Sequence, residues 1–328
     1  MASPGGHSCH VMRTSERRRF LRALLDGAGM ALCAGAGGGL SVCAFGQSQS
    51  AAGGLRESPL RGGLLQLTGI GGNVVVLGTS SGVAMVDSGS VDDDGSLAQL
   101  LAERFEGAPI EVLFNTHWHL DHTGGNEAAG RAGARIIAHE NTRLWMSTEF
   151  YVDWQDRTYS PRPAAARPTE TFYSSDPQPL EIAYAGARIE YGHLREAHTD
   201  GDIYVRFPDQ NVVVAGGAVT VGRYPVPDYM TGGLIGGLIA ATQRLIDMSD
   251  GDTLIVPAVG PAQTRAHLEA QLHMLTTVQE RIVRMARQGR SVPEMLAAGI
   301  TDEFDASWGE NRERFVFNVY QGLWGIGA

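Results

Sequence analysis

Three histidines and one aspartate lie within six positions of the segment NTHWHLDHTGGN, residues 115–126. They are His117, His119, Asp121 and His122. Imidazole nitrogen and carboxylate oxygen are usual ligands of catalytic zinc, which takes three protein ligands and keeps one position for water. His117 and His119 are two residues apart, so in an extended segment both side chains point to the same side. The spacing predicts a metal site that Asp121 can reach, with His122 at the turn into a helix.

The elements around this loop predict a layered α/β protein. The apolar segment IEVLFNT (110–116) predicts a buried strand that ends where the histidines begin. Other Val- and Leu-rich runs predict strands at 64–69, 73–79, 83–89, 135–139, 180–185, 188–194, 203–207, 211–216 and 253–257. Apolar residues at helical spacing predict helices at 96–105, 140–150, 234–248 and 263–289. Mixed strands and helices in two similar halves favour a sandwich of layers.

Two further segments have a less regular pattern. Residues 151–178 are rich in Pro, Ser and Thr and are expected to be irregular. Their aromatic residues either line a pocket or pack onto the sandwich. The tail, 292–324, has Trp308, Phe315, Phe317, Tyr320 and Trp324 at roughly helical spacing, which predicts helices with packed aromatic side chains.

The pattern His-x-His-x-Asp-His resembles the signature of the metallo-β-lactamase superfamily. The resemblance extends over nearly all of the chain beyond its first fifty residues, and its details are similar to the secreted bacterial hydrolases of that superfamily. It rests further on MVDSG (85–89), AHENTR (138–143), AHTDGD (197–202), GRYPVPD (222–228) and IVPAVGP (255–261). The resemblance implies a four-layer αββα sandwich with metals at one edge, between its two sheets. It also implies that His117, His119 and His198 hold the first metal.

The second metal site of the superfamily maps onto Asp121 and His122, but two of its other positions differ here. The aspartate that bridges both metals in many members falls at Gly217, and a late histidine falls at Val259. Neither residue offers a ligand atom, and two protein ligands hold zinc weakly. The prediction is therefore one Zn²⁺, on the three histidines. Possible replacement ligands are His139, His193, Asp200 and Asp202, although each also suits a strand end or a turn.

These residues predict a zinc-dependent hydrolase with a small-molecule substrate. Bound zinc can lower the pKa of its water to about 7, which gives hydroxide at neutral pH. Asp121 would orient that water or accept its proton, and the bond cleaved would be of the ester, amide or lactam type. The missing ligands motivate an alternative, in which the chain is a non-catalytic binding or accessory protein on the same fold.

Composition excludes other classes of function. The formal net charge is -10 with no basic stripe, so nucleic acid is not an expected partner. The sequence contains no lysine, which excludes a Schiff base and a P-loop lysine.

The first 46 residues have the three parts of an export signal. Arg17, Arg18 and Arg19 precede Phe20 and a Gly/Ala-rich run, a pattern that resembles a twin-arginine signal. Cleavage after the small residues near Gly46 would leave a periplasmic or secreted protein with no cysteine and no membrane contact. An uncleaved anchor and a lipoprotein signal at Cys43 are the alternatives. We expect a linker at 47–62 and one domain with a helical tail at 63–328.

Overall fold

The computed structural model describes residues 54–91, 95–173 and 178–324. The chain divides after Gly46, and Gln47–Ala328 form one compact unit. The predicted export signal lies outside the described residues and stays a prediction. Among the helices that are described, none combines the length and the apolar character that crossing a membrane requires.

Seven strands form the first sheet: β1 (Arg56–Pro59), β2 (Leu64–Thr68), β3 (Val74–Gly78), β4 (Val83–Val86), β5 (Ile110–Phe114), β6 (Arg135–His139) and β9 (Glu170–Phe172). They lie in the order β1-β2-β3-β4-β5-β6-β9. Pairing is antiparallel from β1 to β4 and parallel from β4 to β9. Parallel strands in a sheet that is covered on both faces are mostly apolar. β5 fits this rule, because it ends in the buried residues Val112, Leu113 and Phe114.

Five strands form the second sheet: β10 (Leu180–Tyr184), β11 (Ala187–His193), β12 (Ile203–Phe207), β13 (Val212–Gly216) and β14 (Leu254–Pro257). They lie in chain order, with antiparallel pairing except between β13 and β14. The parallel pair is joined by a crossover that contains a helix, as such connections require.

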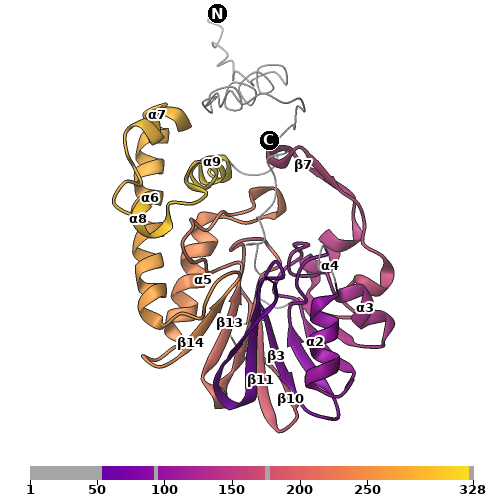
Figure 1. Cartoon of the computed structure of the whole chain (residues 1–328). Coiled ribbons are helices and arrows are strands. Elements are labelled where there is room, and N and C mark those ends of the chain that lie inside the picture. Colours follow the sequence, from indigo (N-terminus) through magenta and orange to yellow (C-terminus); the bar gives the residue numbers. More distant parts are fainter. Residues whose placement is uncertain (1–53, 92–94, 174–177, 325–328) are drawn as a thin grey trace, which may run out of the picture. The chain divides into compact units, whose positions relative to one another are not determined.

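The helices are α2 (Ser96–Arg104), α3 (Asn126–Arg131), α4 (Glu140–Ser147), α5 (Ile235–Asp247), α6 (Arg265–Arg287), α7 (Val292–Ala297), α8 (Asp305–Trp308) and α9 (Arg312–Gly322). Short 3-10 helices are η1 (Arg61–Gly63), η2 (Asp153–Gln155), η3 (Ala164–Ala166), η4 (Pro208–Gln210) and η5 (Tyr229–Thr231). Figure 1 shows α2 and α3 on one side of the two sheets and α5 and α6 on the other.

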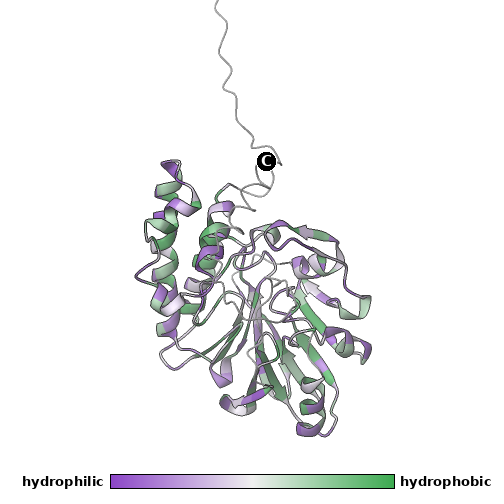
Figure 2. Ribbon diagram, turned by 45° about the horizontal axis from the view of Figure 1, so that its top comes forward, coloured by the Kyte–Doolittle hydropathy of each residue, from purple (hydrophilic) through white to green (hydrophobic). Residues whose placement is uncertain are grey.

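Three apolar layers hold these elements together. Alternate residues of β3 and β13 divide between them, because successive side chains of a strand point to opposite faces. Val75 and Val214 lie in the layer between the sheets, Val74 lies in the layer under α2 and α3, and Val213 lies in the layer under α5 and α6. Figure 2 shows the strands as mostly hydrophobic. Helices outside two packed sheets give the expected four-layer αββα sandwich.

The structure differs from the sequence-based prediction in two segments. β1 lies inside the segment expected to be a linker, 47–62, and pairs with β2, so the sheet begins earlier in the chain. The segment expected to be irregular, 151–178, contains the hairpin of β7 (Phe150–Val152) and β8 (Arg157–Tyr159), and also β9. Strands of three residues are too short to show a period of two in the sequence.

The tail follows its prediction except at its last aromatic residue. Trp308 and Phe315 are buried against α5 and α6, and Phe317 and Tyr320 pack against the same layer. Trp324, however, is 63% exposed, because it lies beyond the end of α9.

Candidate metal centre

The loop after β5 is closed at its base by two asparagines. Asn115 Nδ2 donates to Asn126 Oδ1 at 3.0 Å, and Asn126 Nδ2 donates to Asn115 Oδ1 at 2.8 Å. Both side chains are fully buried. These two hydrogen bonds join the residue after β5 to the first residue of α3, so the two ends of the histidine loop are held together.

The loop brings His117 and His119 together with His198, which lies between β11 and β12. One ring nitrogen from each histidine lies within 4.8 Å of the other two. The ring centroids form a nearly equilateral triangle, with sides of 4.8, 5.0 and 4.8 Å. Within the described part of the chain, this is the one group of three or more ligand-type residues close enough to hold a metal ion.

The second nitrogen of each ring contacts an oxygen atom of the protein. His198 Nδ1 lies 2.8 Å from the carbonyl oxygen of Val226, and His119 Nε2 lies 3.3 Å from Asp228 Oδ2. Carbonyl and carboxylate oxygens only accept, so both nitrogens carry hydrogen. His117 Nδ1 lies 2.9 Å from Thr116 Oγ1. That hydroxyl already donates to Asp87, so it accepts from His117.

These contacts determine which nitrogen of each ring has a free lone pair and can bind a metal ion. The lone pairs lie on His117 Nε2, His119 Nδ1 and His198 Nε2, and the last two atoms are only 3.0 Å apart. Two lone pairs at that distance repel each other unless a cation lies between them. A proton satisfies two such nitrogens, whereas a metal ion satisfies all three. The donor set therefore fits a metal, and the oxygen contacts are those expected around metal-ligating histidines.

Burial keeps two of these rings in the neutral form that a metal requires. Burial, together with the neighbouring histidines, holds the pKa of His117 well below its usual value. Burial and the adjacent His119 lower the pKa of His198 to about 4. A neutral imidazole needs no deprotonation before it binds a metal.

Asp121 and His122 lie beside the triad. Burial raises the pKa of Asp121, but His122 and His119 outweigh it, so the carboxyl group is ionised at neutral pH. The Asp121 side chain is 34% exposed, and its Oδ2 lies 3.9 Å from His122 Nε2. Burial lowers the pKa of His122, yet the carboxylates of Asp87 and Asp121 raise it to about 9. Without a metal, His122 is thus a cation between two carboxylates.

A family model matches the part of the sequence that contains this site. Residues 67–269 match the family model of the metallo-beta-lactamase superfamily. The chain belongs to the metallo-β-lactamase superfamily.

Solved structures share its fold. A metallo-β-lactamase from Pontibacter korlensis superimposes with a TM-score of 0.56 at 20% identity, over 68% of this chain and 99% of that one. The DIM-1 metallo-β-lactamase gives 0.53 at 16% identity, over 68% and 97%. VMB-1 at pH 5.5 gives 0.54 at 16% identity, over 68% and 96%. Identities this low establish the fold and leave the reaction to be argued from the site.

Gly217, where the superfamily resemblance expects a bridging aspartate, lies directly against His198 of the three-histidine group. A Cβ atom at this position would lie 2.3 Å from His198 Cδ2 and 2.7 Å from its Cγ. The imidazole ring of His198 therefore occupies the space of a side chain at 217. Gly217 lacks a ligand atom, and the packing around it also leaves no room for one.

Val259, where the resemblance expects the late histidine, lies in a turn that is held by Asn73, the residue before β3. Asn73 Nδ2 donates to the carbonyl oxygens of Pro257 and Gly260, at 2.9 and 2.8 Å. The backbone N–H of Asn73 donates to Ala258 at 2.7 Å. These bonds hold the turn that carries Val259 against Asn73, and the side chain at 259 is apolar.

The four possible replacement ligands have structural contacts instead. Asp202 accepts from the backbone of His198 and Thr199, and Asp200 accepts from Trp145 Nε1 at 2.8 Å. The rings of His139 and His193 stack on each other, with centroids 3.8 Å apart. In the described chain, none of the four joins the three-histidine group.

Two aspartates of the site were missed by the sequence-based prediction. Asp87 follows β4 with a φ of 60° and accepts from Thr116 N, Thr116 Oγ1 and His122 Nδ1, each at 2.7 Å. Asp228 accepts from His119 and from Thr231 Oγ1. Both lie in the segments MVDSG and GRYPVPD that carried the resemblance. Asp87 is 1% exposed and Asp228 is 2% exposed, and a buried carboxylate needs hydrogen-bond partners, which only the fold reveals.

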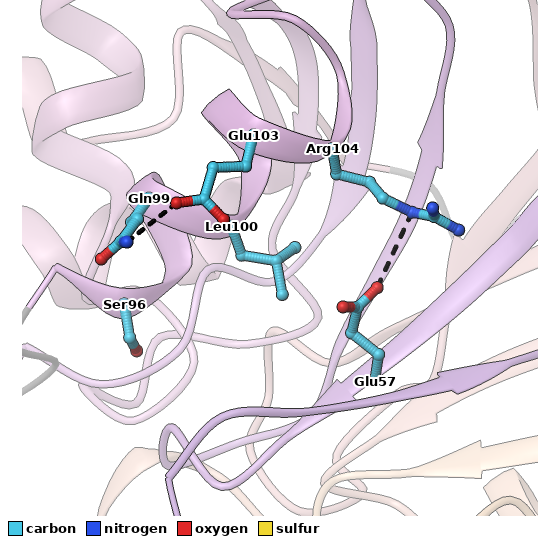
Figure 3. Close-up of a pocket in the computed structure, with 6 residues that line it drawn as sticks. All are labelled: Glu57, Ser96, Gln99, Leu100, Glu103 and Arg104. Atoms are coloured by element: carbon cyan, nitrogen blue, oxygen red, sulfur yellow. Dashed lines mark hydrogen bonds and ion pairs between the residues drawn. The ribbon is translucent and has the colours of Figure 1, made fainter.

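A separate surface hollow does not compete with this centre. It has a volume of about 290 Å³ and is lined by Glu57, Ser96, Gln99, Leu100, Glu103 and Arg104 (Figure 3). Gln99 donates to Glu103 at 2.9 Å, and Arg104 pairs with Glu57 at 3.8 Å. Its charged groups are exposed, and each contacts another residue of the lining.

Proposed function

We propose that this protein is a zinc-dependent hydrolase with one metal ion. His117 Nε2, His119 Nδ1 and His198 Nε2 hold the ion. The observation that carries the proposal is the 3.0 Å approach of two unprotonated nitrogens in the triad, each on a ring whose other nitrogen donates a hydrogen bond to a protein oxygen. Three neutral imidazoles with one open position form the ligand set of a catalytic zinc.

The chemistry divides between the ion and the side chains around it. When bound, zinc acts as a Lewis acid and lowers the pKa of water. Asp121 is ionised and 34% exposed, so it can accept a proton from the attacking water. His122, tied to Asp87 at 2.7 Å, holds its other nitrogen toward Asp121 and fixes the direction in which that carboxylate faces.

The substrate in this proposal is a small molecule with an ester, amide or lactam-type bond. The protein would act in the periplasm or outside the cell, after removal of a twin-arginine-type signal. Export of a folded protein would allow zinc to be loaded in the cytoplasm.

Elemental mass spectrometry of the purified protein tests the metal. We expect about one zinc per chain, lost in His117→Ala and retained in His273→Ala, because His273 is an exposed residue of α6. A panel of ester, amide and lactam substrates then tests the reaction, with a chelator abolishing hydrolysis and added zinc restoring it.

Each result decides between the alternatives. Two zinc ions per chain would contradict the single-metal site. Absence of zinc after reconstitution would overturn the hydrolase and favour a binding or accessory protein on the same fold. One zinc without hydrolysis across the panel would favour that alternative with a structural metal.

A further inference from the structure

The three metal-binding histidines are not held equally. The contacts that orient His117 and His198 are 2.9 and 2.8 Å long and involve a buried hydroxyl and a backbone carbonyl. The contact that orients His119 is 3.3 Å long, and the His119 side chain is 18% exposed. His119 therefore depends most on how well its partner, Asp228, is itself held in place.

Asp228 is oriented by the hydroxyl group of Thr231. Thr231 Oγ1 donates to Asp228 Oδ2 at 2.8 Å and accepts from Trp118 Nε1 at 3.2 Å. The direction of both bonds is fixed, because an indole N–H only donates and a carboxylate only accepts. The Thr231 side chain is fully buried, so no solvent replaces either bond. The hydroxyl hydrogen is thus directed at the oxygen that His119 contacts.

Trp118 stands between the two histidines in sequence and restrains His119 in a second way. Its ring centroid lies 4.3 Å from that of His119, at an interplanar angle of 70°. On its other side, the indole contacts Phe150 at 5.1 Å and Tyr159 at 4.9 Å, both from the β7–β8 hairpin. These contacts bury Trp118 to 2% exposure, so its N–H has one fixed direction.

The hairpin that supports Trp118 is itself fixed at several points. A two-stranded hairpin is marginal alone, so it needs tertiary contacts. Tyr229 Oη donates to Asp153 Oδ1 at 2.8 Å, and the Arg314 guanidinium of α9 lies 4.8 Å from the centre of the Trp154 ring. Figure 1 shows β7 near α9 at the end of the sheets. The support of Trp118 is therefore attached to both η5 and α9.

We propose that Trp118 and Thr231 are positioning residues for the metal: through the chain Trp118–Thr231–Asp228, they fix the ring of His119 so that Nδ1 faces the ion. This inference rests on the proposed zinc site. Loss of a group that orients a metal ligand weakens metal binding about 10- to 100-fold. Thr231→Val keeps the shape but removes the hydroxyl, and Trp118→Phe keeps an aromatic ring but removes the N–H. Thr231→Ser keeps the hydroxyl.

The experiment measures the zinc dissociation constant of each variant by competition with a chromophoric chelator, and the visible spectrum of its cobalt(II) form. We expect Thr231→Val and Trp118→Phe to bind zinc about 10- to 100-fold more weakly, with a shifted cobalt spectrum, and Thr231→Ser to match the wild type. Thr253→Val is the matched control, because Thr253 is also fully buried and donates to Asn211 Oδ1 at 2.7 Å, away from the histidines.

The outcomes separate this inference from the proposed function. Wild-type protein that binds no zinc would overturn both. Tight zinc binding in wild type, Thr231→Val and Trp118→Phe alike would overturn the positioning role and leave the hydrolase standing. Equal weakening in Thr253→Val would show that a general loss of stability is responsible, which also overturns the role. If Thr231→Val does not fold, Trp118→Phe against Thr253→Val gives the same decision.

Discussion

His119 Nδ1 and His198 Nε2 lie 3.0 Å apart, each on a ring whose other nitrogen donates to a protein oxygen. The oxygens of Asp228 and Val226 thereby force two acceptor nitrogens to face each other. A shared proton satisfies these two nitrogens only by giving one ring a positive charge, whereas a metal ion also satisfies His117 Nε2. Metal binding is therefore linked to the stability of the fold.

Zinc is accordingly expected to stabilise the protein against unfolding. A ligand present at 100 times its dissociation constant adds about 2.7 kcal/mol to the free energy of unfolding. Thermal unfolding followed by circular dichroism should show a higher midpoint with zinc and a lower one with chelator. The His198→Ala variant should show no zinc-dependent shift, whereas His273→Ala should keep it. A shift that persists in His198→Ala would place the stabilising metal elsewhere.

Gly217→Ala should displace the His198 ring and weaken zinc binding, because any side chain at this position needs space that the ring occupies. The added Cβ would lie 2.3 Å from His198 Cδ2, so the ring must move away from the triad. Overpacking of this kind costs about 1 to 3 kcal/mol. Urea denaturation should show that loss, and metal analysis should show reduced zinc.

Gly236→Ala is the matched control for this substitution. No heavy atom lies within 4 Å of a Cβ at that position, which is in the first turn of α5. Alanine there should stabilise the helix by roughly 0.5 to 1 kcal/mol and leave zinc unchanged. Gly217→Ala that binds zinc as well as Gly236→Ala would refute the packing argument.

Much of the fold could be predicted from the sequence, for reasons visible in single elements. β5 and β13 are short runs rich in Val and other apolar residues, and α5 and α6 have clear helical spacing, so their local signals agree with the final structure. β1 could not be predicted, because its four residues, RESP, are all exposed and its position depends on pairing with β2. The β7–β8 hairpin depends in the same way on contacts with Trp118 and α9.

Some residues of the candidate site could be predicted from the sequence, and others could not. His117 and His119 follow from their spacing on one loop, and His198 needed the family pattern because 79 positions separate it from His119. Asp87, Asp228 and Thr231 act only through hydrogen bonds made in the folded chain. Gly217 was predicted as a missing ligand, but only the structure shows that the ring of His198 occupies the space beside it.

Asp87→Asn should destabilise the protein and weaken the site together. Asp87 accepts from the N–H and the hydroxyl of Thr116 and from His122, so an amide nitrogen would face a donor. Lost hydrogen bonds to a buried charged group cost about 1.5 to 3 kcal/mol each. The measurement is urea denaturation with and without zinc. Asp156→Asn is the control, since Asp156 is exposed and also has a positive φ, 49°.

That comparison separates charge from backbone conformation. Asparagine tolerates the left-handed conformation at both positions. Asp156→Asn should therefore change the free energy of unfolding by less than about 0.5 kcal/mol. An equally small effect at position 87 would mean that the Asp87 carboxylate does not organise the loop.

Acid should weaken the contact between the two sheets at the His139–His193 pair. His139 is 1% exposed, and its ring stacks on His193 and accepts from the backbone N–H of Asn141 at 3.2 Å. Burial and the neighbouring His193 lower the pKa of His139 to about 4, against an opposing effect of Glu140. Since the folded-state pKa lies below the usual value, the unfolded chain binds the proton more tightly than the folded chain.

The sign of the pH dependence follows. The contribution of His139 to stability is complete above about pH 6.5 and declines as the pH falls from there toward 4. His139→Asn removes the titrating ring and keeps an acceptor suited to the start of α4. Urea denaturation from pH 7 to pH 4.5 should show wild type losing about 1 to 2 kcal/mol more than the variant, after allowance for solvent screening. Parallel pH profiles for the two proteins would contradict the prediction, because they would show that the pKa of His139 does not change on folding.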